Sequence, residues 1–172
     1  TDNKNNLFET LVVPKDFRII GTLNTKDKNY LFQMSDALKR RFEIIEISPP
    51  EFENAEREIE IVVKKVVDGL EDDIKSSLGI SSYSDLLKNG DEKRDYIYLA
   101  YEILAFIRTH NNLGTALLIS VIKFMLVFNS MEKKPGENYS LDECLDIGLC
   151  NSILPQIEKL PLLKLETIKN FV

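Results

Sequence analysis

The sequence predicts a short α/β segment followed by an all-α bundle, and three observations support this fold class. Two short, isoleucine-rich apolar runs lie before residue 48, and turn residues bound each of them, as is typical of strands in a covered sheet. The composition changes at Ser48-Pro49-Pro50, and beyond it apolar residues recur at helical intervals. We therefore expect an α/β part over residues 1–50 and a helical part over residues 51–172.

The first part contains two predicted strands with a short helix between them. The strands are residues 17–23 and 42–47, and both are expected in the middle of a covered sheet because they are short, rich in isoleucine and bounded by turn residues. The segment between them leaves room for a short helix that ends at Arg41, with Ser35 or Asp36 as the N-cap.

The first long helix is expected to begin near Pro50 and Glu51, because proline and acidic residues both suit a first helical turn. Its apolar residues step by three and four and form one stripe that should face the core. The opposite face carries charged residues and should lie in solvent. The stripe consists of Phe52, Ala55, Ile59, Val62, Val63, Val66, Val67 and Leu70.

Further helices are separated by residues that break helical structure. Gly79 ends the first region, a short helical turn is expected through Asp85 and Leu87, and Asn89-Gly90 closes that segment. A second helix is then predicted from the apolar spacing that follows. Its core residues are Tyr96, Leu99, Ala100, Ile103, Leu104 and Ile107.

The most apolar segment, residues 116–128, follows a break at residues 111–114 and is predicted to be the central helix of the bundle. Lys123 interrupts it, and it is shorter than the roughly 20 apolar residues of a membrane-spanning helix, so no membrane association is expected. Pro135-Gly136 ends that region. Ser140 and Glu143 have capping-box spacing before a fourth helix. Pro155 and Pro161 divide the remaining residues into short pieces.

Charge and cysteine usage limit the classes of function. The formal net charge of −6 argues against a protein that mainly neutralises a nucleic-acid backbone. Cys144 and Cys150 are expected on different faces of one helix, so no disulfide should join them, and a reducing cytoplasmic location fits. His110 is the only histidine, which disfavours hydrolytic nucleophile chemistry and two-histidine metal sites.

Asn24 follows the first predicted strand, where the crevice at the carboxyl ends of strands in open α/β sheets binds ligands. An amide at that place can orient an attacking water and contact a terminal phosphate without carrying charge. The alternative is that Asn24 and Thr25 only form the turn that ends the strand.

Arg40 and Arg41 end the predicted short helix, and two interpretations apply to them. Arginine near a helix C-terminus interacts favourably with the helix dipole, which is a purely structural role. The functional interpretation is an arginine finger, whose planar guanidinium stabilises charge on a phosphoryl group transferred in a neighbouring subunit.

The run from Val13 to Asp27, followed by Asp36-Ala37-Leu38-Lys39-Arg40-Arg41-Phe42, resembles the second half of a AAA+ ATPase module of the McrB-like and MoxR-like branch. The resemblance covers residues 11–50 and implies the C-terminal strands of a P-loop NTPase core followed by a helical lid. It implies that Asn24 is sensor 1 and that Arg41, together with Arg40, is the arginine finger. Asp27 also matches the family's pattern, and a turn-stabilising role is expected for it.

Two elements of the family's pattern are missing from the chain. None of its seven glycines precedes a lysine, so it has no phosphate loop, and no apolar run ends in the Asp-Glu pair that would hold Mg²⁺. Both lie upstream in the family, so we expect this chain to be the C-terminal part of a larger protein and to be inactive alone. No arginine lies near residues 113–115, where many AAA+ proteins have sensor 2, while Arg108 lies on the preceding helix.

The resemblance thus implies part of a ring-forming motor or remodelling NTPase that uses ATP or GTP with Mg²⁺ and that hydrolyses nucleotide between subunits. Family resemblance favours a hexamer and a nuclease or a remodelled protein as partner, and the acidic helical part should not bind DNA strongly. Two alternatives remain: a non-enzymatic helical interaction module, and a degenerate AAA+ subunit that contributes only its arginine finger.

Overall fold

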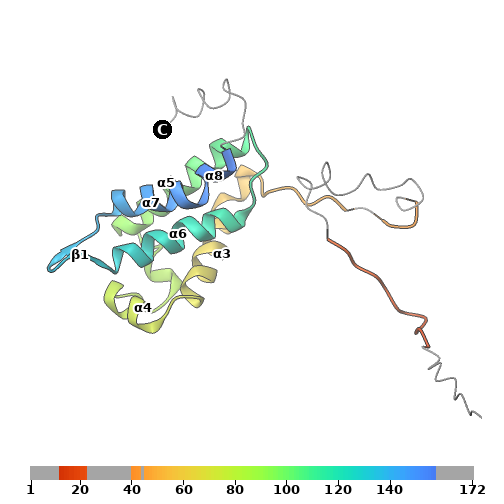
Figure 1. The fold of residues 1–172 in the computed structure, drawn as a ribbon, viewed down its shortest axis with the longest axis horizontal. Helices are drawn as coiled ribbons and strands as arrows, with labels where there is room; N and C mark the ends of the chain where they lie inside the picture. The colour runs from red at the N-terminus through yellow and green to blue at the C-terminus, as the bar shows by residue number, and fades with distance from the viewer. Residues whose placement is uncertain (1–11, 23–39, 44, 158–172) are drawn as a thin grey trace, which may run out of the picture. The chain divides into compact units, whose positions relative to one another are not determined.

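The structure, a computed structural model, describes residues 12–22, 40–43 and 45–157. The chain divides into two units, Thr1–Glu46 and Ile47–Val172, and each is considered separately here. The described residues are predominantly helical, and the sheet found among them has only two strands (Figure 1).

The two strands predicted in the first unit are not present in its described residues, which is a correction to the sequence analysis. Residues 17–22 belong to no strand, nor do residues 42, 43 and 45–47. Ile20 is 92% exposed and Ile45 79% exposed, whereas a central strand would bury both. A strand requires neighbours that accept and donate its backbone hydrogen bonds, and the described residues provide none for these two runs.

Turns define the other described parts of this unit. Phe17 N–H donates to Pro14 O at 3.1 Å, which closes a turn at Lys15 and Asp16. Arg40 and Arg41 also lie in a turn. The remainder of the short helix predicted before Arg41 lies outside the described residues.

The second unit begins with a 3-10 turn, η1 (Phe52–Asn54), that leads into α3 (Ala55–Asp68). This start agrees with the predicted first helix, and six residues of the predicted stripe are buried. They are Ile59, Val62, Val63, Val66, Val67 and Leu70. Phe52 was also predicted to face the core, but it lies in η1, before α3 begins, and is 70% exposed.

Two short helical segments connect α3 to the next long helix. The sequence analysis missed the first, α4 (Asp72–Leu78), which ends at Gly79 with φ of +67°, a conformation that favours glycine. The second, η2 (Tyr83–Asp85), is the predicted turn through Asp85.

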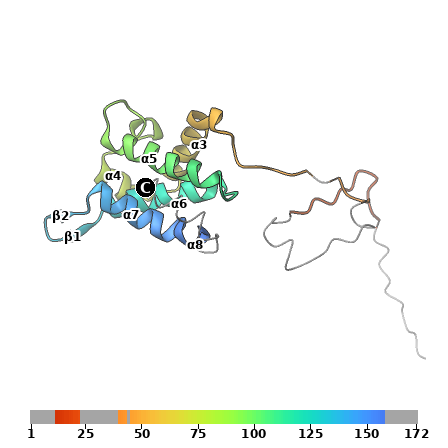
Figure 2. The same ribbon diagram turned by 90° about the horizontal axis from the view of Figure 1, so that it is seen from above.

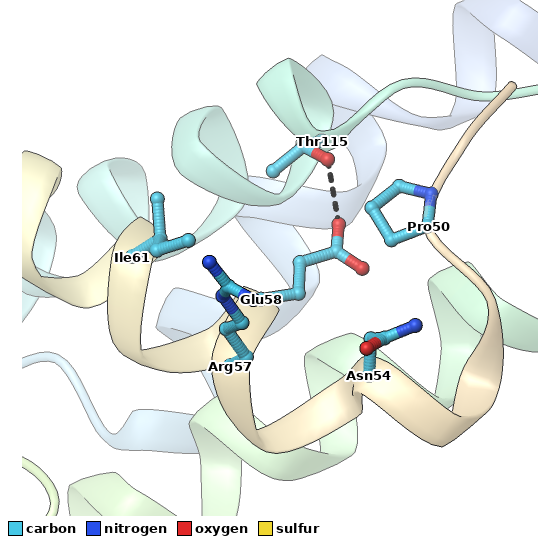
Figure 3. Close-up of a pocket in the computed structure, with 6 residues that line it drawn as sticks. All are labelled: Pro50, Asn54, Arg57, Glu58, Ile61 and Thr115. Atoms are coloured by element: carbon cyan, nitrogen blue, oxygen red, sulfur yellow. Dashed lines mark hydrogen bonds between the residues drawn. The ribbon is translucent and has the colours of Figure 1, made fainter. Parts of the chain in front are cut away.

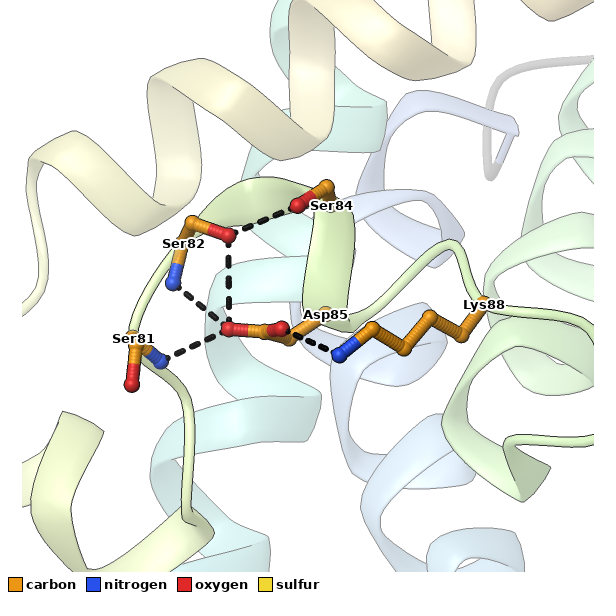
Figure 4. A network of polar contacts seen from close by, with 5 residues as sticks. All are labelled: Ser81, Ser82, Ser84, Asp85 and Lys88. Carbon is orange, nitrogen blue, oxygen red and sulfur yellow. Dashed lines mark hydrogen bonds and ion pairs between the residues drawn. The ribbon is translucent and has the colours of Figure 1, made fainter.

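Figure 4 shows how η2 is capped. Asp85 accepts hydrogen bonds from the backbone N–H groups of Ser81 and Ser82 at 2.9 and 2.8 Å, and from Lys88 Nζ at 2.7 Å. The bond from Lys88 and those from the two serines hold the pKa of Asp85 well below its usual range. Because all these partners are local, this network stabilises the connection between α4 and the following helix.

The central helix of the bundle is α6 (Thr115–Asn129), as the sequence predicted. In Figure 1 it lies between α3 and α4 on one side and α5 (Glu92–Arg108) and α7 (Leu141–Ser152) on the other, and it contacts all four helices. Five of its side chains are completely buried: Leu118, Val121, Ile122, Met125 and Leu126.

A small hairpin and two helices complete the described fold. Strands β1 (Glu132–Lys134) and β2 (Glu137–Asn138) pair antiparallel around Gly136, whose φ is +80°, and the hairpin projects from one end of the bundle (Figure 2). Ser140 and Glu143 form the predicted capping box of α7, and α8 (Leu154–Ile157) follows.

The two cysteines lie on different faces of α7, as their helical spacing predicted. Cys144 faces the core and Cys150 is exposed, and both are free. Burial, with a smaller contribution from the charge of Glu143, raises the pKa of the Cys144 thiol to about 11.

Candidate functional site

The residues predicted to act on nucleotide lie in the first unit, and the structure describes only some of them. Asn24 and Asp27 lie outside the described residues. Arg40 and Arg41 are described, and both side chains are exposed. Whether Asn24 and the two arginines serve one site therefore stays a prediction.

The second unit contains a buried charged cluster that the sequence analysis missed. Glu58 on α3 is only 4% exposed. Its carboxylate accepts two parallel hydrogen bonds from Arg108, at 2.7 Å from Nη2 to Oε1 and 2.8 Å from Nη1 to Oε2. Thr115 Oγ1 also donates to Oε1 at 2.7 Å. One carboxylate thus joins α3, the end of α5 and the start of α6.

All three nitrogen atoms of the Arg108 guanidinium donate hydrogen bonds within this cluster. Arg108 Nε donates to the carbonyl oxygen of Leu113 at 2.9 Å, so the guanidinium also fixes the chain that connects α5 to α6. Burial alone raises the pKa of Glu58, but the hydrogen bonds from Arg108 and Thr115 and the charge of Arg108 outweigh it, so the pKa lies below its ordinary value of 4.5. Glu58 is therefore ionised at neutral pH.

A cavity of about 300 Å³ opens beside this cluster, next to the segment that enters the bundle. Figure 3 shows the Glu58 carboxylate facing Thr115, with Pro50 and Asn54 beside it. The cavity is lined by Pro50, Asn54, Arg57, Glu58, Ile61 and Thr115.

The cavity has groups that suit an anion. Thr115 is the first residue of α6, and no side chain caps the N-terminus of this helix, so its backbone N–H groups and dipole favour negative charge there. The exposed Arg57 adds a cation, while the charge of Glu58 is already matched by Arg108. Arg57 and Thr115 line the same cavity, so Arg57 lies near residues 113–115, where the resemblance implies a sensor-2 arginine.

Arg108 itself is not available for that role. Its side chain is 9% exposed, and its guanidinium is committed to Glu58 and to Leu113 O. The sequence held only a weak sign of this pair. The predicted apolar stripe did not include Glu58, although this residue lies one turn before Val62 and so at the margin of the stripe.

The described residues also limit other kinds of site. Within residues 12–22, 40–43 and 45–157, no group of three or more His, Cys, Asp or Glu side chains could hold a metal ion. In the same ranges no helix combines the length and apolar character that crossing a membrane requires.

The chain matches no family model, no curated protein and no solved structure.

Proposed function

We propose that this chain is the sensor-1, arginine-finger and lid portion of a ring-forming AAA+ nucleoside triphosphatase that uses ATP or GTP. The observation that carries the proposal is the pair of motifs, Gly21–Thr25 and Asp36–Phe42, in the family's order and followed directly by a separate helical unit. We place this motor or remodelling enzyme in the cytoplasm.

Two features of the described residues support the division into core and lid. The hydrophobic core of the helical unit is formed by residues between Ile59 and Ile157. This unit thus has a core of its own, as an independent subdomain does. The described apolar residues of the first unit, such as Ile20 and Ile45, are exposed, which leaves them available for contact with other parts of a larger protein.

The proposed mechanism is positioning and charge stabilisation. Asn24 orients the attacking water against the terminal phosphate, and Arg41, with Arg40 beside it, stabilises the transferred phosphoryl group in the neighbouring protomer. The phosphate loop and the carboxylates that hold Mg²⁺ belong to the remainder of the protein, and the ion would neutralise charge on the phosphates. In the lid, Arg57 and the N-terminus of α6 line one cavity, and we propose them as the groups that would contact the nucleotide.

One observation favours the non-enzymatic alternative. A groove of about 640 Å³ lies beside the exposed Phe52, and apolar grooves of this size bind ligands or partner segments. A helical interaction module would use such a groove without any hydrolysis. A degenerate subunit would instead keep the arginine finger and lose its own turnover.

Substitution of Arg41 in the full-length protein tests the proposal. Arg41→Ala should lower kcat for ATP or GTP hydrolysis by about 10³-fold or more, because an arginine finger acts mainly in the transition state. The dissociation constant for nucleotide should change by less than about threefold, since the finger belongs to the adjacent protomer. Steady-state hydrolysis and equilibrium nucleotide binding measure the two effects.

Arg94→Ala is the matched control, because Arg94 lies on α5 with its guanidinium 4.3 Å from the Tyr98 ring and outside both cavities. It should leave kcat unchanged. A wild-type protein that hydrolyses neither nucleotide would favour the interaction module. Equal turnover by the wild type and Arg41→Ala would show that Arg41 is not an arginine finger.

A further inference from the structure

The groove beside Phe52 lies between the segment Ser48–Phe52 and helix α5 and has a volume of about 640 Å³. Aromatic side chains form part of its wall. The Phe52 and Tyr101 rings have their centroids 6.1 Å apart, yet Phe52 remains 70% exposed. An exposed aromatic ring in a concave, largely apolar surface is typical of a docking site.

The charged side chains of the groove that have no ion-pair partner among the described residues are negative. Glu51 and Glu102 both line it and are exposed, and neither forms an ion pair with a residue that the structure describes. Arg108 lines it as well, but its charge is matched by Glu58 through the bidentate pair. The groove therefore offers an aromatic wall with two carboxylates, which suits a cation carried beside an apolar or aromatic group.

We propose that this groove binds the segment Arg40-Arg41-Phe42 of a second copy of the chain. The segment has the complementary chemistry: two exposed arginines followed by a phenylalanine that is 41% exposed. Arg40 pairs with Glu51 and Glu102, and Phe42 packs on Phe52. A guanidinium can bind two carboxylates and stack on a ring at the same time.

The docking also separates the roles of the two arginines. Adjacent residues in a turn point in different directions, so a segment anchored by Arg40 and Phe42 leaves Arg41 directed elsewhere. This inference rests on the proposed function, in which residues 40 and 41 act across a boundary between protomers. Anchoring on both sides of Arg41 would hold its guanidinium in the geometry that catalysis in the adjacent protomer requires.

Charge exchange tests the docking in the full-length protein. Arg40→Glu and Glu102→Arg should each weaken self-association by about tenfold or more, because each brings like charges together. The double variant Arg40→Glu/Glu102→Arg should restore it. An equimolar mixture of the two single variants should also associate, since each variant offers the surface that the other needs. Sedimentation velocity over a range of concentrations measures association, and circular dichroism checks that each variant is folded.

Asp146→Arg, which reverses an exposed charge on α7 outside the groove, is the control and should associate like the wild type. A wild type that stays monomeric, or single variants that associate normally, would overturn the docking. Restoration in the double variant but not in the mixture would also overturn it, because it would place the contact within one chain. Association that responds as expected in a protein without hydrolysis would leave the docking in place and reject the NTPase function alone.

Discussion

At the scale of single residues, the buried Glu58 carboxylate is the clearest tertiary feature of the helical unit. A buried charge is tolerated when each of its hydrogen-bonding positions is matched, and Arg108 and Thr115 match them here. The pair connects three helices at the end of the bundle where the chain enters. Its role is to fix the relative position of α3, α5 and the N-terminus of α6.

The lowered pKa of Glu58 predicts an acid-sensitive contribution to stability. A carboxyl group whose pKa is lower in the folded state stabilises the fold above its unfolded pKa, and this contribution is lost as the pH falls through the folded value. The wild type should therefore lose stability as the pH falls below 4.5. Glu58→Gln should be less stable at pH 7 and should show a smaller decrease over that acidic range. Chemical denaturation between neutral and acidic pH measures both.

Asp146→Asn serves as the control, because it removes an exposed carboxylate from α7, a helix that contributes nothing to the buried pair. It should reproduce the wild-type pH dependence. If Glu58→Gln also had the wild-type slope, the buried carboxylate would not contribute as described.

At the scale of elements, α7 lies close against α6 at Gly148. A Cβ atom added at Gly148 would lie 2.9 Å from the backbone carbonyl oxygen of Val121 and 3.3 Å from its Cγ1 atom. Backbone atoms in the centre of a bundle cannot move aside as a flexible side chain can. The absence of a side chain at Gly148 therefore sets the distance between α6 and α7.

Gly148→Ala should therefore destabilise the bundle, although alanine has the higher helix propensity. Overpacking of this kind costs about 1–3 kcal/mol, which exceeds the gain of about 1 kcal/mol from replacing glycine within a helix. Urea denaturation followed by circular dichroism measures the change. Gly69→Ala is the control, because its added Cβ would approach the backbone no closer than 3.4 Å. A variant at position 148 as stable as the wild type would show that α6 and α7 are more loosely packed.

The helices were largely predictable from the sequence because their signals are local. The small polar face of residues 116–128 placed α6 at the centre, and Ser140 with Glu143 marked the start of α7. The hairpin and α4 were missed because they are short and have no strong apolar period of their own. The two predicted strands were wrong for the described residues, because an apolar run becomes a strand only beside a pairing partner.

The candidate site was predictable only in part. Motif spacing selected Arg40 and Arg41, which are exposed, and their role stays a prediction. The Glu58–Arg108 pair and the cavity beside Arg57 depend on contacts between helices that are distant in sequence, and no local pattern specifies those contacts.

At the scale of the whole molecule, the division after Glu46 separates the two functions in the proposal. The first unit carries the motifs expected to act on the phosphates, and the second carries a self-contained helical core. If protomers assemble head to tail in a ring, each nucleotide site combines Asn24 of one protomer with Arg41 of the next. The central claim is that these two residues act from different chains.

Mixing two inactive variants of the full-length protein tests this claim most directly. Asn24→Ala disables the site of its own protomer, and Arg41→Ala withholds the finger from the neighbouring site, so each protein alone should be inactive. In a randomly mixed ring of equal parts, about one quarter of the sites would combine an intact Asn24 with an intact Arg41 from the adjacent protomer. We predict that the mixture recovers about one quarter of the wild-type hydrolysis rate, whereas a mixture as inactive as its two components would contradict action between chains.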